Sequence, residues 1–366
     1  MDTRFFYVCL LSCLSCFSQK EELPKKFTID ANPFYGSIML HNTDISHLIN
    51  AHPAGVILGF NKKNFGSKEW HQEYNYPDTG LSFIYQDMNY DILGKNYSLY
   101  AHYNFYFFNR NMQFRIGQGL AYNTNPYDKN ENFRGNAYGS HIMSSTFMML
   151  NYHKGQIFKG LGINVGIYII HYSNANVKSP NTSTNTFAFN AGLIYDLNRN
   201  EEIFYARNFD KKKITEPIKA NLVFRSGINE SDVINSGQFP FYIFSAYADK
   251  RLSRKSGIQL GAEVFFSNFL KELIRYQSIA FPEMNVDPDT DYKRVGMFMG
   301  YELYISKLSV IAQLGYYVYF PFDFEGEVYN RIGLKYYFGK KLFGAVTLKS
   351  HGAAAEAVEF GLGIRL

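Results

Sequence analysis

The feature that most constrains this chain is an alternation of apolar and polar residues that recurs along almost its whole length. Segments of about ten to fourteen residues alternate with period two, and each one ends in a polar break. This period places the apolar side chains on one face of a β-strand. Beyond the first twenty residues, no apolar run approaches the roughly 18 residues that a membrane-spanning helix needs. The pattern predicts an all-β protein.

The number of these segments and their aromatic content narrow the class further. Aromatic residues make up 18% of the 366 residues, and 29 residues are glycine. An even number of antiparallel strands with aromatic-rich outer faces is typical of an outer-membrane barrel. We therefore predict a transmembrane antiparallel β-barrel of about 14–16 strands. The sixteen predicted strands are 27–39, 54–64, 81–90, 97–108, 112–122, 138–152, 159–173, 186–197, 217–227, 237–250, 256–268, 293–305, 307–320, 327–338, 340–349 and 354–366.

The breaks between these strands alternate in length. Short breaks such as 306–307 have the size of periplasmic turns, and longer ones such as 174–185 have the size of extracellular loops. This alternation directs strand 159–173 toward the outer leaflet. Two polar stretches, 65–80 and 198–216, are long on the predicted periplasmic side, and we expect them to fold inward or to pack beneath the barrel.

The chain begins with the pattern of a secretory signal over residues 1–18, with cleavage expected before Gln19. All three cysteines lie in this segment, so the mature chain would carry no disulfide framework. A lipoprotein with an acylated cysteine is the weaker alternative, because an ordinary cleavage site follows directly.

The rest of the chain shows no linker and no tandem repeat. We therefore predict one barrel domain over 19–366, in which the strands of 215–366 close a barrel begun by 27–200. The last strand alternates cleanly up to Leu366, as terminal strands that barrel-insertion machinery recognises do.

The formal net charge of +5 favours contact with anionic lipid headgroups. Lys129, Arg134 and Lys178 lie in predicted outer loops, where they could contact lipid phosphates or simply be solvated. Nucleic-acid binding is not expected, because the chain has no basic stripe and is exported.

No cofactor is expected. The histidines at 41, 47 and 52 match no metal-binding spacing. The acidic loop 287–291 lacks the glycine and the final glutamate of a calcium-binding loop. No glycine-rich phosphate loop joins a strand to a helix.

Strand 159–173 ends in polar residues on its apolar face. His171 and Ser173 continue the parity of its aliphatic side chains, and Asn185 shares the apolar face of the next strand. A hairpin would therefore place these three residues on one apolar surface, with His171 and Ser173 roughly 6.5–7 Å apart. Composition alone favours the end of a strand and the start of a loop. The alternative is a hydroxyl nucleophile, a histidine base and an amide that holds the base.

The motif His171-x-Ser173-Asn174-Ala175, followed by Pro180-Asn181, resembles the signature of the outer-membrane lipid A 3-O-deacylases, the PagL family. The larger acyloxyacyl-hydrolase-like outer-membrane proteins of Bacteroidetes are also similar at 52–55, 66–70, 74–77, 117–122 and 348–351.

This resemblance implies a role for each residue of the motif. Ser173 would be the nucleophile and His171 the general base. The backbone N–H of Asn174 and the side chain of Asn181 would be oxyanion donors. The family carries a glutamate as third member, where this chain has Asn185. An amide can orient an imidazole, but it cannot stabilise imidazolium by charge.

The resemblance further implies an ester hydrolase in the outer membrane of a Gram-negative, Bacteroidetes-like bacterium. It would remove an acyl chain from lipid A in lipopolysaccharide, or from a related outer-leaflet lipid. Two alternatives stay open. The lumen of a sixteen-stranded barrel favours a channel or transporter, and Asn185 in place of glutamate favours an inactive lipid-binding barrel. The sequence does not decide between a monomer and a homodimer.

Overall fold

The computed structural model describes residues 26–198, 205–206, 214 and 216–366, so the signal expected at 1–18 lies outside the described residues. The described part contains sixteen antiparallel strands, which confirms the predicted class and the strand count. The strands are β1 (Phe27–Ile38), β2 (Ala54–Lys62), β3 (Asp78–Asp87), β4 (Lys95–Phe107), β5 (Met112–Asn123), β6 (Ile142–Phe158), β7 (Leu161–Ser173), β8 (Thr184–Asp196), β9 (Lys219–Asn229), β10 (Phe239–Arg251), β11 (Ser256–Ser267), β12 (Lys293–Ile305), β13 (Leu308–Tyr319), β14 (Val328–Tyr337), β15 (Leu342–His351) and β16 (Ala354–Arg365).

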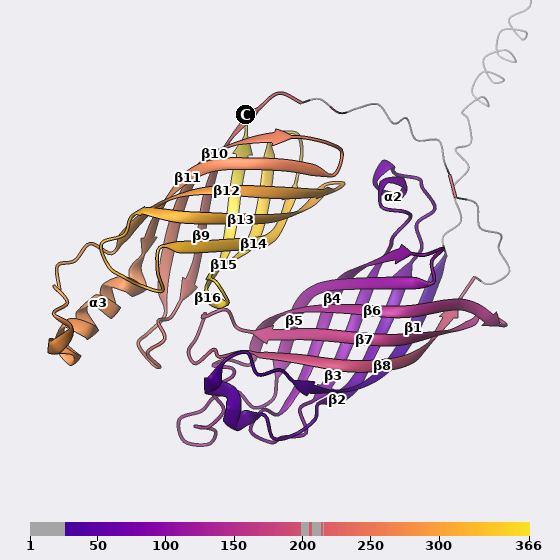
Figure 1. The fold of residues 1–366 in the computed structure, drawn as a ribbon, viewed down its shortest axis with the longest axis horizontal. Coiled ribbons are helices and arrows are strands. Elements are labelled where there is room, and N and C mark those ends of the chain that lie inside the picture. Colours follow the sequence, from indigo (N-terminus) through magenta and orange to yellow (C-terminus); the bar gives the residue numbers. More distant parts are fainter. Residues whose placement is uncertain (1–25, 199–204, 207–213, 215) are drawn as a thin grey trace, which may run out of the picture.

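These strands close into two barrels of eight, which lie beside each other (Figure 1). In the first barrel β8 pairs back onto β1, and in the second β16 pairs back onto β9. The prediction of one barrel domain over 19–366, closed by the strands of 215–366, is therefore wrong. Each closure leaves no sheet edge with unpaired backbone groups, as a membrane requires. The long polar stretch at 198–216 lies between the two barrels in the sequence, and most of it is outside the described residues, so the expectation for it is not tested.

The outer face of each barrel is apolar, and much of the inside is lined by polar and charged side chains. Leu120 and Phe189 are 64% and 68% exposed on the outside of the first barrel. Inside it, the fully buried Arg115 and Asp30 form an ion pair with an Nη2–Oδ2 distance of 2.6 Å. Polar inside and apolar outside is the arrangement of a membrane barrel. The other end of this interior is filled by an apolar cluster that contains Phe147.

The second barrel has a more highly charged interior. Arg331 lies between Glu263 and Glu359, at 2.9 and 2.6 Å, and all three are completely buried. Barrels of eight strands are filled by side chains in this way. The wide lumen on which the channel alternative rested is therefore not formed.

Short helical segments extend the loops. They are η1 (Thr43–Leu48), α2 (Glu69–Glu73), α3 (Asn268–Ala280) and η2 (Pro282–Met284). Within the described ranges, no helix is long and apolar enough to cross a membrane.

The stretch 65–80, which contains α2, packs against the second barrel. Glu69 forms an ion pair of 2.7 Å with Arg254, and the hydroxyl of Tyr74 donates to the carbonyl of Tyr304 at 2.8 Å. The stretch was expected to fold inward or to pack beneath its own barrel, and these contacts place it against the neighbouring barrel instead.

Candidate active site

The loop end of β7 carries His171 and Ser173 on the outer side of the first barrel. Along β7, Leu161 and Val165 are 40% and 50% exposed, whereas Tyr168 and Tyr172, of opposite parity, are buried inside. His171 and Ser173 have the parity of the exposed residues. The structure therefore confirms that β7 turns this face of the strand outward.

A row of polar residues crosses this outer face at the level of His171. Gln118 of β5 pairs with Thr146 of β6, Thr146 pairs with His171, and His171 pairs with Asn185 of β8. The hydroxyl of Thr146 donates to the side-chain carbonyl of Gln118. Four neighbouring strands thus present polar groups at one level of a surface that is otherwise apolar. Polar groups on a lipid-facing surface are costly and mark functional positions.

Asn185 orients the ring of His171. Its side-chain oxygen lies 2.8 Å from Nδ1 of the imidazole. An amide oxygen can only accept a hydrogen bond, so Nδ1 carries the proton and donates. The lone pair of the neutral ring is then on Nε2, the nitrogen available to act as a base.

Ser173 is surrounded by hydrogen-bond donors of the loop that follows β7. Its Oγ accepts from the backbone N–H of Ala175 and from Nδ2 of Asn181, both at 2.9 Å. The backbone N–H of Asn174 donates to Oδ1 of Asn181 at 2.9 Å, and the same oxygen lies 3.1 Å from Oγ of Ser173. Of the two groups expected as oxyanion donors, the amide of Asn181 bonds directly to Ser173, and the N–H of Asn174 bonds to that amide.

The five site residues form two hydrogen-bonded groups. One is His171 with Asn185, and the other is Ser173 with Asn174 and Asn181. No hydrogen bond joins His171 to Ser173 within the described residues, and Ser173 is only 5% exposed. In ligand-free enzymes the hydrogen bond between nucleophile and base is often long and tightens when substrate binds.

Sequence reasoning missed the polar residues on the strands beside β7. Gln118 lies between Ile116 and Leu120, which are 37% and 64% exposed on the same face of β5. A polar residue that interrupts an apolar face at period two is a signal that the sequence contains. The pairing of Gln118 with Thr146 could not be predicted from the sequence, because it depends on the register between β5 and β6.

Four glutamates lie on strands of the second barrel, and none of them lies beside His171. All four are buried inside the second barrel, where each bonds to a basic residue. They are Glu263, Glu302, Glu356 and Glu359, which bond to Arg331, Lys335, Arg294 and Arg331 in that order.

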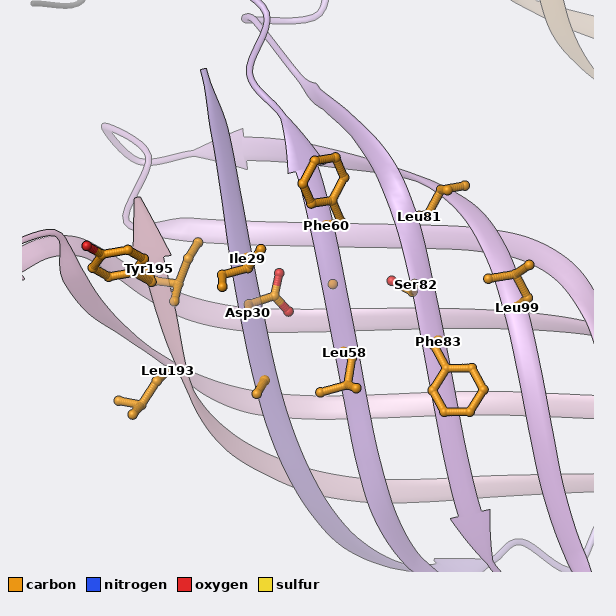
Figure 2. Close-up of a pocket in the computed structure, with 13 residues that line it drawn as sticks. Ile29, Asp30, Leu58, Phe60, Leu81, Ser82, Phe83, Leu99, Leu193 and Tyr195 are labelled. Atoms are coloured by element: carbon orange, nitrogen blue, oxygen red, sulfur yellow. The ribbon is translucent and has the colours of Figure 1, made fainter. Parts of the chain in front are cut away.

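An apolar concavity of about 500 Å³ lies on the outside of the first barrel, over β8 and β1 to β4. Figure 2 shows Leu58, Phe60, Phe83 and Leu193 among its lining residues. None of the five site residues lines it. The concavity is therefore part of the lipid-facing surface and lies apart from the site.

The apolar outer face defines this protein as a membrane β-barrel. The histidine and serine on that face form a candidate hydrolase site. Two family models match the chain. "Lipid A 3-O-deacylase (PagL)" matches residues 54–193, and "Acyloxyacyl hydrolase, C-terminal domain" matches residues 218–366. The two matches divide the chain where the two barrels divide and together span most of it. The protein belongs to the PagL family, an outer-membrane family of acyl-ester hydrolases.

Solved structures with detectable likeness include two mutants of Rh. blastica porin. A triple mutant is 7% identical and a double mutant 8% identical. Each match covers 94% of this chain and all of the porin, with a TM-score of 0.18. Folds with so low a TM-score do not superpose, so this likeness carries no conclusion. Among curated proteins, none matches the sequence.

Proposed function

We propose that this protein hydrolyses one acyl ester of lipid A, or of a related acylated lipid of the outer leaflet, with Ser173 as nucleophile. One observation carries the proposal. The amide of Asn181 bonds both to Ser173 and to the N–H of Asn174, two residues beyond an oriented His171, on the outer face of a barrel of the PagL family. Membership of the family supports the ester chemistry, and the geometry supports the assignment of residues.

The proposed reaction has two half-reactions. Oγ of Ser173 attacks the acyl carbonyl carbon while Nε2 of His171 takes the hydroxyl proton. The negative charge on the carbonyl oxygen is met by Asn174 N–H and the Nδ2 group of Asn181. The intermediate collapses to an acyl-serine, and the departing sugar hydroxyl takes the proton from His171. Water then releases the fatty acid by the same steps, and Ser173 is regenerated.

In this proposal Asn185 orients His171, and the polar row on β5 and β6 binds the substrate. Gln118 and Thr146 lie at the level of His171, where an acyl ester linked to a sugar would approach. The low dielectric of the lipid face strengthens hydrogen bonds to the developing charge.

The loops above the site carry exposed basic residues that suit an anionic headgroup. Lys129, Arg134 and Lys178 are exposed, and the described part of the chain shows no ion pair for any of them. We infer that they attract the phosphates of lipid A at the outer leaflet, whereas the apolar face of the barrel contacts its acyl chains.

Mass spectrometry of lipid A tests the proposal. Gram-negative cells that express the wild-type protein are expected to contain lipid A lighter by one acyl chain. Cells that express Ser173→Ala at equal membrane level are expected to contain unaltered lipid A, because the acyl-serine cannot form. Unaltered lipid A with both proteins would contradict deacylation of lipid A. Purified protein that binds lipopolysaccharide without turnover would then establish the inactive lipid-binding barrel.

The residue at position 185 should tune the rate. Asn185→Glu is expected to raise kcat by roughly fivefold, since a hydrogen bond to a charged group is worth about 1 kcal/mol more than a neutral one. Asn185→Ala is expected to lower kcat, since it leaves Nδ1 of His171 without its partner. Steady-state hydrolysis of a micellar acyl ester measures both effects. An unchanged kcat in Asn185→Ala would remove Asn185 from the site.

A further inference from the structure

The loop that carries the candidate site is held by the second barrel as well as by its own. This loop, residues 174–183, joins β7 to β8 and meets residues 230–238, which join β9 to β10. Five hydrogen bonds connect the two loops. They are Ser179 N to Glu230 Oε2 at 2.9 Å, Ser179 Oγ to Ser231 O at 2.5 Å, Glu230 N to Asn176 O at 2.8 Å, Gln238 Nε2 to Val177 O at 2.7 Å and Asn176 Nδ2 to Asp232 Oδ1 at 3.3 Å.

Glu230 is the centre of this contact. Its carboxylate accepts from the backbone N–H of Ser179 across the two barrels and from the N–H of Gly237 in its own loop, at 2.9 and 3.2 Å. Glu230 and Ser179 are 4% and 3% exposed. A buried carboxylate that accepts backbone hydrogen bonds forms stronger bonds than a neutral acceptor does. The loop is therefore fixed by a strong and largely dry contact.

A chain of hydrogen bonds leads from this contact to the nucleophile. The backbone carbonyl of Asn176 is held by the N–H of Glu230. Oδ1 of Asn176 in turn accepts from Nδ2 of Asn181 at 3.1 Å, and Asn181 bonds to Ser173. The position of Asn181 thus depends on a residue that the second barrel holds.

The backbone of the loop supports the same conclusion. Ala175 and Asn176 have φ angles of +53° and +58°. An alanine pays a steric cost in this left-handed region and stays there only where surrounding contacts fix it. The contacts of Asn176 with the second barrel are of that kind.

We propose that the second barrel is a positioning domain for the ester-hydrolase site of the first. Glu230 and its neighbours hold loop 174–183 so that Asn181 keeps its hydrogen bonds to Ser173 and to the N–H of Asn174. This inference rests on the proposed function. In the proposed reaction Glu230 touches no substrate, so it is a positioning residue. Displacement of a catalytic group by about 1 Å can cost on the order of a hundredfold in rate.

Kinetics of full-length Glu230 variants test this role. Glu230→Ala is expected to lower kcat by roughly ten- to a hundredfold, with KM within about threefold of wild type, because the oxyanion donors are displaced and the lipid-binding surface is intact. Glu230→Gln is expected to keep most of the activity, since its amide oxygen still accepts from Ser179 N–H. Glu327→Ala is the matched control. Glu327 is an exposed glutamate of the second barrel whose carboxylate bonds to the hydroxyl of Tyr316, and its loss should leave kcat unchanged.

Hydrogen exchange of loop 174–183 supplies the second readout. The amide of Ser179 is expected to exchange faster in Glu230→Ala than in the wild type or in Glu230→Gln. A kcat within twofold of wild type together with faster exchange would overturn the positioning role. Unchanged exchange would overturn the contact itself. Should Glu230→Ala fail to fold, Ser179→Ala combined with Gln238→Ala removes two other bonds of the same contact and is judged by the same measurements.

The exchange result is separable from the fate of the proposed function. Full activity in Ser173→Ala would overturn the ester-hydrolase assignment and with it the catalytic meaning of the contact. Exchange is measured without substrate, so it decides whether the second barrel holds the loop in either case.

Discussion

Purified Ser173→Ala and His171→Asn variants are each expected to lose at least about a thousandfold in deacylation rate. Ser173→Ala removes the atom that would form the acyl-enzyme. His171→Asn removes the base that takes its proton, while a polar side chain remains at the level of Asn185. Groups that act as one unit show losses of similar size when either is removed, so the double variant should be no slower than the slower single variant.

Steady-state hydrolysis of lipid A in micelles measures these rates. Heat-modifiable mobility on gels checks that the barrels are folded. Ser226→Ala is a suitable control, because its hydroxyl lies in the second barrel and donates only to the carbonyl of Phe241. Full activity in Ser173→Ala would remove the nucleophile assignment. Full activity in His171→Asn alone would leave Ser173 in place but require another base.

The sequence predicted individual strands better than their closure. The predicted bounds for β7 and β12, 159–173 and 293–305, agree with Leu161–Ser173 and Lys293–Ile305 within two residues. Period-two alternation is a local property, so it can be read from the sequence. Whether β8 pairs with β1 or with β9 is not local, and the alternation is the same in either case. The long polar stretch at 198–216 was the one local sign that the barrel ends there.

For the candidate site, the same distinction separates what the sequence predicted from what it did not. Parity along β7 predicted that His171 and Ser173 share one face. The motif predicted that Asn181 acts beside Ser173, and the two residues are hydrogen-bonded. The polar row needs the register of β5 against β6, and the contact of Glu230 with Ser179 needs two barrels side by side. No periodicity in the sequence encodes either of these relations.

Breaking the ion pair inside the first barrel should destabilise that barrel strongly, because one charge is left buried alone. Arg115→Met is expected to lower the free energy of unfolding by about 3–5 kcal/mol, because the carboxylate of Asp30 is then buried without its cation. Arg115 also donates to Oδ1 of Asn104 at 2.7 Å, and the loss would leave this buried oxygen without that donor. Urea unfolding in lipid vesicles, followed by circular dichroism, measures the change from the shift in midpoint.

A second substitution, at Asp30, distinguishes the cost of the unpaired charge from the cost of losing the packing of the Arg115 side chain. Asp30→Leu combined with Arg115→Met removes both charges, and the double variant is expected to be more stable than Arg115→Met alone. Lys95→Met is the surface control. Its ion pair with Asp87, at an N–O distance of 3.2 Å, is open to solvent, and its removal should leave the midpoint unchanged. If Arg115→Met behaved like Lys95→Met, the interior of this barrel would have to be hydrated enough to solvate Asp30. A hydrated interior of this kind would favour a water-filled channel through the barrel.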